Sequence, residues 1–199
     1  MKKLLLSLIL TYLTSYLFGQ LDSNSKTFIF NIIKLQPGSD TITYTDRIKP
    51  IVIPSLGKIL LKDRIPCYDI TGHTKTEFVP SALEMSQIQH AAKYITKIRW
   101  DDSLFSNSRE ISVDSMWSYI SNRQKELSFS SNTSDNINNI VSYCSVFQFS
   151  KPIFLRNKTI VIFYFMRLCG SSCGEENLSI YRLQNGKYQR WLTIQGADF

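Results

Sequence analysis

The chain has 199 residues, of which 43% are hydrophobic, 20% charged and 13% aromatic, and its formal net charge is +7. This length and composition predict one globular domain, and the low counts of glycine (8) and proline (6) exclude collagen-like and wholly disordered classes. Lysines and arginines are scattered singly, which argues against nucleic acid as a partner because such binding needs a clustered basic footprint.

The N-terminus has the pattern of a secretory signal peptide. Lys2 and Lys3 form a positive start, residues 4–18 are apolar apart from serines and threonines, and Gly19 is a small residue at the expected cleavage position. The apolar run has about 15 residues, whereas a helix that spans a bilayer needs about 20. We therefore expect a single mature domain over residues 20–199, secreted or periplasmic, with no stable membrane anchor.

Residues 20–80 are predicted to be a β-rich and loop-rich N-terminal part. Residues 27–35 (TFIFNIIKL) are β-branched and aromatic and end at a turn signal, and residues 41–45 alternate in a way that favours a hairpin with them. Residues 48–80 contain repeated prolines and glycines, which favour short strands and loops.

Two helices are predicted after residue 80. Ser81 and Glu84 have the spacing of a capping box, and apolar residues then recur every three or four positions as far as Trp100. Ser112 or Asp114 can cap a second, shorter helix with its own apolar face. The polar residues 128–139 that follow are typical of a loop.

The last third of the chain predicts an antiparallel β-meander of about four strands. Residues 159–166 (TIVIFYFM) are apolar on both faces, as expected of a central strand, and Asn185-Gly186 is a strong hairpin signal. Because the helices precede the strands instead of alternating with them, the predicted fold class is α+β. It comprises two helices, then the antiparallel meander, with an additional β-rich N-terminal segment.

Three short motifs follow one another in this region: S-K-P-I-F at residues 150–154, C-G-S-S-C-G at residues 169–174 and G-K at residues 186–187. In this respect the chain resembles a family of small exported bacterial proteins of unknown function, whose members carry S-x-P-[IV]-F, C-G-x-L-C-G and G-K-W. The resemblance covers about residues 80–199, with departures at Ser172, Glu176 and Tyr188. It implies a related fold and the same compartment, and it implies no activity.

The cysteines are the next candidates for a site. Cys67, Cys144, Cys169 and Cys173 form an even set, and an oxidising compartment favours disulfides among them, with three possible pairings. Cys169 and Cys173 are close enough in sequence to close a short loop, which leaves Cys67 to pair with Cys144. A zinc site is disfavoured because the spacing is not C-x-x-C and no histidine follows the first helix, so we expect no metal and no cofactor.

Two classes of function remain. The first is a non-enzymatic binding or interaction module that recognises a protein or a cell-envelope component. Its surface would be an exposed sheet face or the loop around the last two cysteines, with these candidate residues: Gly170, Ser171, Ser172, Gly174, Glu175 and Glu176.

The second class is a small carboxylate-dependent hydrolase of the cell envelope, using Asp101 and Asp102 with His90. Residues 170–174 also fit the nucleophile-elbow pattern G-x-S-x-G. That motif needs a helix after it and a later histidine, and neither is expected here, so no catalytic residue is assigned from it.

Overall fold

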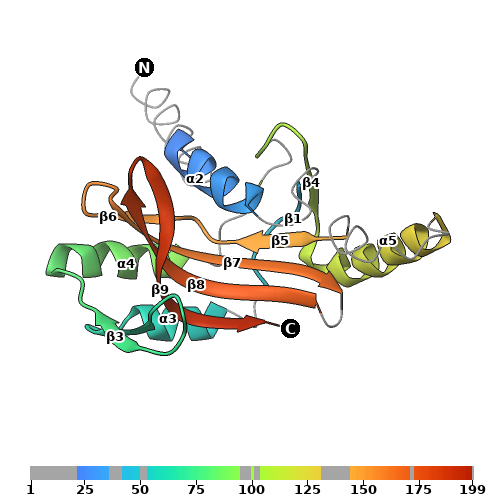
Figure 1. Cartoon of the computed structure of the whole chain (residues 1–199). Coiled ribbons are helices and arrows are strands. Elements are labelled where there is room, and N and C mark those ends of the chain that lie inside the picture. Colours follow the sequence, from blue (N-terminus) through green and yellow to red (C-terminus); the bar gives the residue numbers. More distant parts are fainter. Residues whose placement is uncertain are drawn as a thin grey trace, which may run out of the picture.

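The computed structural model describes residues 22–35, 42–49, 53–94, 100, 104–130, 144–170 and 173–198, which form a nine-stranded sheet and four α-helices (Figure 1). The strands are β1 (Ile42–Thr45), β2 (Ile65–Tyr68), β3 (Lys75–Phe78), β4 (Ser108–Ile111), β5 (Val146–Phe149), β6 (Ile153–Leu155), β7 (Ile160–Gly170), β8 (Cys173–Gln184) and β9 (Lys187–Asp198). The helices are α2 (Ser23–Lys34), α3 (Ile53–Leu60), α4 (Ala82–Tyr94) and α5 (Met116–Ser130), the last preceded by the 3-10 helix η1 (Val113–Ser115).

The sheet is mixed, with the strand order β3-β2-β9-β8-β7-β5-β1-β4, and β6 also pairs with β7. Strands β5, β7, β8 and β9 are antiparallel neighbours, but β1 lies parallel to both β4 and β5. Parallel pairing needs long crossover connections, and the chain between β1 and β4 supplies one that contains α3 and α4. The predicted α+β fold, two helices and a four-strand antiparallel meander, is therefore wrong.

Residues 27–35 were predicted to form a strand and instead belong to helix α2. The Asp22 side chain caps this helix by accepting a hydrogen bond from the Ser25 backbone N–H at 3.1 Å. Its buried apolar residues recur at helical spacing, which places them on one face. Residues 53–60, where short strands and loops were expected, likewise form helix α3.

The predicted central strand is confirmed as β7, whose side chains are buried on both faces of the sheet. Ile162 and Tyr164 point into one core, which α3, α4 and α5 cover. Val161 and Phe163 point into a second core, which α2 covers from the opposite face. Figure 1 shows this arrangement, with α2 above the sheet and α3 and α4 below it.

The two helices predicted after residue 80 are confirmed as α4 and α5, but α4 ends at Tyr94, with residues 95–99 outside the described part of the chain, and α5, expected to be the shorter, is the longer with 15 residues against 13. Glu84 accepts a hydrogen bond from the Ser81 N–H at 2.7 Å, and Ser81 Oγ accepts one from the Glu84 N–H, as in a capping box. Ser112 caps η1, which continues into α5. Helix α5 extends to Ser130, so the first residues of the predicted loop are helical, and residues 131–139 lie outside the described part of the chain.

The predicted hairpin at Asn185-Gly186 is also confirmed, since it joins β8 to β9. Both residues have positive φ, 50° and 75°, as a two-residue turn of this kind requires.

Candidate functional site

A hollow of about 690 Å³ lies on the sheet between β8, β9 and the turn that follows β2. Its charged and amide residues are Glu175 and Asn177 from β8, and Arg190 and Gln195 from β9. Ile70, from the turn, lies at its rim and is 66% exposed. We call this feature the β8–β9 hollow.

Strand alternation positions the β8 side of this hollow. Glu175, Asn177, Ser179 and Tyr181 are two residues apart, so they share one face of β8. Tyr181 belongs to the core under α2, which assigns this row to the α2 face of the sheet. Toward the N-terminal end of β8 this row changes from the aromatic Tyr181 to the polar Asn177 and Glu175, and these two polar residues line the hollow.

Two irregularities in β9 shape the other side of the hollow. The register between β8 and β9 shifts by one residue at two places, which leaves Ile194 and Trp191 of β9 without partners in the ladder. Such bulges re-aim the side chains beside them and are common next to binding sites. Arg190 and Gln195 flank these two positions.

Within the hollow, one carboxylate collects two contacts. Glu175 Oε1 accepts a hydrogen bond from Asn177 Nδ2 and forms an ion pair with Arg190 Nη1 at 3.4 Å. Gly196 permits this packing, because a Cβ on it would lie 2.7 Å from Asn177 Oδ1. The three polar side chains are therefore fixed relative to one another.

Two buried oxygen atoms at this end of the sheet have no hydrogen-bond partner among the described residues: Ser179 Oγ and Gln195 Oε1. Buried polar atoms are nearly always hydrogen-bonded, so each such atom requires an explanation. Burial raises the pKa of neighbouring Tyr181 to about 12, with Arg190 opposing the shift and Glu175 adding to it.

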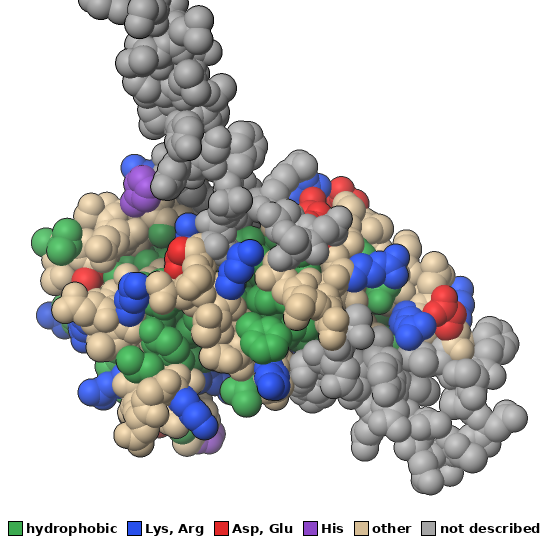
Figure 2. All heavy atoms as spheres, turned by 90° about the horizontal axis from the view of Figure 1, so that it is seen from above, with side chains coloured by type: hydrophobic (Ala, Val, Ile, Leu, Met, Phe, Trp, Pro, Cys, Tyr) green, Lys and Arg blue, Asp and Glu red, His purple; other side chains and the backbone are tan. Residues whose placement is uncertain are grey.

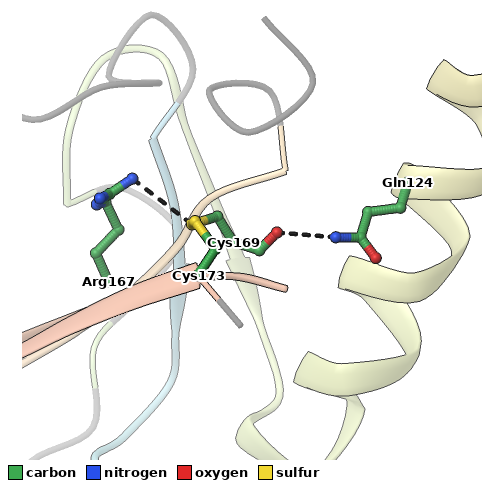
Figure 3. Close-up of a disulfide and its surroundings, with 4 residues drawn as sticks. All are labelled: Gln124, Arg167, Cys169 and Cys173. Carbon is green, nitrogen blue, oxygen red and sulfur yellow. Dashed lines mark hydrogen bonds between the residues drawn. A yellow bond between two sulfur atoms is a disulfide. The ribbon is translucent and has the colours of Figure 1, made fainter. Parts of the chain in front are cut away.

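The Cys169–Cys173 disulfide closes the β7–β8 connection, as predicted from the sequence, with the two Cα atoms 5.2 Å apart. Arg167 Nη1 donates a hydrogen bond to Cys169 Sγ at 3.7 Å, and Gln124 Nε2 of α5 donates one to the Cys169 carbonyl at 2.9 Å. Figure 3 shows these two side chains on opposite sides of the disulfide. The bond fixes the start of β8, two residues before Glu175.

The expected pairing of Cys67 with Cys144 is wrong, because both are buried free thiols. Cys67 lies on β2 and Cys144 directly precedes β5, and three strands separate β2 from β5 in the sheet. At about 4.8 Å per strand spacing, the two are on the order of 19 Å apart, far beyond the reach of a disulfide. Burial raises the pKa of both thiols.

The candidate surface loop is mostly strand. Gly170 ends β7, and Gly174, Glu175 and Glu176 belong to β8, whereas Ser171 and Ser172 lie outside the described residues. Glu175 and Glu176 point to opposite faces of β8, since Glu176 Oε1 accepts a hydrogen bond from the Tyr164 hydroxyl at 3.3 Å. Among the described residues of this predicted loop, Glu175 alone lines the β8–β9 hollow.

The proposed hydrolase residues are not brought together in the described part of the chain. Asp101 and Asp102 lie outside it, and His90 is an exposed residue of α4. The G-x-S-x-G pattern is followed directly by β8, so the helix that a nucleophile elbow requires is replaced by a strand. Within the described residues, no group of three or more His, Cys, Asp or Glu side chains is placed to hold a metal ion.

Sequence reasoning missed Asn177, Arg190 and Gln195. The alternation of Glu175 and Asn177 along a strand was a usable signal, because residues two apart share a face. Arg190 and Gln195 had no such signal, since their positions depend on the two irregularities in β9.

The comparisons with known proteins add no relative. No family model matches the chain, and no curated protein and no solved structure matches it. Among the described residues, none of the helices has the length and apolar character needed to cross a membrane. On the face seen in Figure 2, the lysine and arginine side chains of the described residues are spread out, with hydrophobic side chains between them.

Proposed function

We propose that this protein is an exported, non-enzymatic binding module that recognises a cell-envelope component through the β8–β9 hollow. One observation carries the proposal: Glu175, Asn177 and Arg190 are in mutual contact on the β8–β9 hairpin, and β8 begins at the disulfide that closes the β7–β8 connection. A preformed set of polar groups lowers the entropic cost of binding.

Export is part of the proposal and has two supports. The first residues have the composition of a signal peptide, and the Cys169–Cys173 disulfide suits an oxidising compartment. The resemblance of residues 80–199 to small exported bacterial proteins agrees with this compartment. Mass spectrometry of protein expressed in a bacterium tests it, because processing after Gly19 yields a chain that begins at Gln20. Recovery of the unprocessed chain from the cytoplasm contradicts it.

The binding function is tested by co-sedimentation of the purified protein with washed cell-envelope material. We expect the parent protein to sediment with the envelope, and Arg190→Ala and Glu175→Gln to reduce the bound fraction strongly. Arg123→Ala is the matched control, because Arg123 is also an accessible arginine paired with a glutamate, on α5 and away from the hollow. Equal sedimentation of all four proteins, or none by the parent, contradicts the proposal.

A further inference from the structure

The charges that line the β8–β9 hollow cancel. Glu175 and Arg190 are its acidic and basic side chains, and they form an ion pair with one another at 3.4 Å. A ligand with a net charge would have to break this pair or leave its own charge uncompensated. The hollow therefore favours a neutral, polar ligand.

The backbone of the hollow's floor is engaged on the β8 side, because strands β8 and β9 pair with each other from Glu175 and Asp198 to Gln184 and Lys187. On its other side, β9 pairs with β2 through Tyr68 and Thr193 alone among the described residues. An extended peptide recognises a sheet chiefly through free backbone groups at such an edge. The choice between a peptide and another neutral ligand therefore depends on the side chains of the hollow.

The available side chains match a ligand that carries several hydroxyl groups. Asn177 and Arg190 both contact Glu175 Oε1, which leaves the second carboxylate oxygen without a hydrogen bond from a described residue. The Arg190 guanidinium is a donor with 42% of its side chain exposed. A hydroxyl group both donates and accepts, so adjacent hydroxyls can satisfy the carboxylate and the guanidinium at once.

The rim of the hollow adds an apolar surface. Tyr68 is 37% exposed and Ile70 is 66% exposed, and both line the hollow from β2 and the turn that follows it. An aromatic ring beside planar polar groups is suited to a pyranose, which has an apolar face of C–H groups and an equatorial belt of hydroxyls.

We infer that the β8–β9 hollow binds a neutral saccharide, with Glu175 and Arg190 hydrogen-bonded to its hydroxyls and Tyr68 packed against a sugar face. This inference rests on the proposed binding function and names the ligand class for the same site. In this arrangement, the polar side chains of the hollow meet the hydroxyls of the sugar, and the apolar rim meets the face of its C–H groups.

Isothermal titration of the purified protein with a tetramer of N-acetylglucosamine tests the inference. We expect saturable binding, weakened at least about tenfold by Arg190→Ala, Glu175→Ala and Tyr68→Ala, since each removes a charged hydrogen bond or a packed ring. Trp117→Ala is the control for Tyr68→Ala, because Trp117 is an aromatic residue of α5 with 47% exposure and lies outside the hollow. Thermal unfolding of each variant confirms that it is folded.

Three further titrations separate the competing ligands: a glucuronic acid oligomer, a glucosamine oligomer and an unbranched tetrapeptide. The inference is overturned if the parent protein binds a charged oligomer or the peptide in preference to the neutral tetramer, or if Arg190→Ala leaves tetramer binding intact. It is also overturned if no saccharide binds. If envelope co-sedimentation still depends on Arg190 in that case, the proposed function survives, and if that dependence is lost as well, both fail.

Discussion

At the scale of single residues, a strained turn binds α4 to the sheet. Arg156, Asn157 and Lys158, between β6 and β7, all have positive φ, at 50°, 51° and 66°. For residues with side chains this conformation costs roughly 1–2 kcal/mol each. Arg156 offsets part of that cost, because its Nε donates to Glu84 Oε1 at 3.0 Å and its guanidinium stacks on Phe78.

We predict that Glu84→Ala lowers the free energy of unfolding by about 2 kcal/mol at neutral pH, since it removes both the helix cap and the partner of Arg156. Burial disfavours the ionised carboxylate, but hydrogen bonds from the Ser81 N–H and Arg156 outweigh burial and lower the pKa of Glu84. A lowered pKa stabilises the fold above the ordinary carboxyl range, and that stabilisation is lost as the pH falls through the lowered value.

Urea denaturation at neutral pH and at about pH 3 measures both parts of this prediction. The difference in free energy of unfolding between the parent protein and Glu84→Ala is expected to be smaller in acid than at neutral pH. Glu126→Ala is the control, because Glu126 forms an exposed ion pair with Arg123, and such pairs contribute about 0–1 kcal/mol. If Glu84→Ala lowers the free energy of unfolding no more than Glu126→Ala does, the contact between Glu84 and Arg156 does not stabilise the fold as predicted.

The residues of the three sequence motifs have structural positions. Ser150 directly follows β5, and its Oγ accepts a hydrogen bond from the Tyr164 N–H at 3.1 Å while its own N–H donates to the Tyr164 carbonyl. Pro152 separates β5 from β6, and both strands pair with β7. The cysteine motif and Gly186 close the two hairpins that follow. These motifs therefore shape the strands around β7, and the polar groups of the hollow lie mostly outside them.

At the scale of elements, α2 shows why composition misled the sequence analysis. Residues 27–35 are rich in isoleucine and phenylalanine, which favour strands, but Phe28, Ile29, Ile32 and Ile33 have the spacing of one helical face. Tertiary packing decided between the two, since Phe28 makes edge-to-face contacts with Phe154, Phe163, Tyr181 and Tyr188 at centroid distances of 5.0 to 6.0 Å. These partners are more than a hundred residues away in the sequence, so no local window contains them.

We predict that Phe28→Ala destabilises the protein by about 3–5 kcal/mol, because it leaves a cavity at the centre of this aromatic cluster. Phe30→Ala, on the same helix, is the matched control, since Phe30 is 38% exposed. Its cost should be about 1 kcal/mol or less. Chemical denaturation of the three proteins checks the difference, and equal costs for the two variants argue against the observed placement of α2.

Strand β7 supports a second prediction at this scale. Val161 is fully buried in the core under α2. Val161→Asp would place a charge there without a partner, and we expect loss of the folded state or a cost above about 3 kcal/mol. Leu183→Asp on β8 is the control, because Leu183 is 37% exposed, and its cost should stay near about 0.5 kcal/mol. If Val161→Asp lowers the free energy of unfolding by only about 0.5 kcal/mol, the Val161 side chain faces solvent and the placement of β7 is wrong.

At the scale of the whole molecule, long-range pairing joins the two parts that the sequence analysis separated. Strand β1 lies between β4 and β5, and β2 pairs with β9, so residues 42–45 and 65–68 complete the sheet built by the C-terminal region. Local patterns predicted the β8–β9 hairpin, because its turn residues are adjacent in sequence. They did not predict the insertion of β1, because no turn or hydrophobic period specifies a partner strand 60 residues away or more.

The same strand order sets the cysteine chemistry of the whole chain. Of the four cysteines, Cys169 and Cys173 form a disulfide. The other two, Cys67 and Cys144, are buried free thiols. Because β9, β8 and β7 lie between their strands, these two thiols cannot meet without dismantling the sheet. Burial also keeps them protonated and out of reach of thiol reagents, since the thiolate is the reactive form.

We therefore predict the number of thiols that react in three states of the protein. The folded protein should show essentially no reactive thiol, the protein unfolded without reductant should show two, and the protein unfolded after reduction should show all four. Alkylation followed by mass spectrometry gives each number, and peptide mapping without reduction should find Cys169 joined to Cys173 and both other cysteines alkylated. Absence of reactive thiols in the unreduced, unfolded protein would require a bond between Cys67 and Cys144, which is incompatible with three strands between β2 and β5.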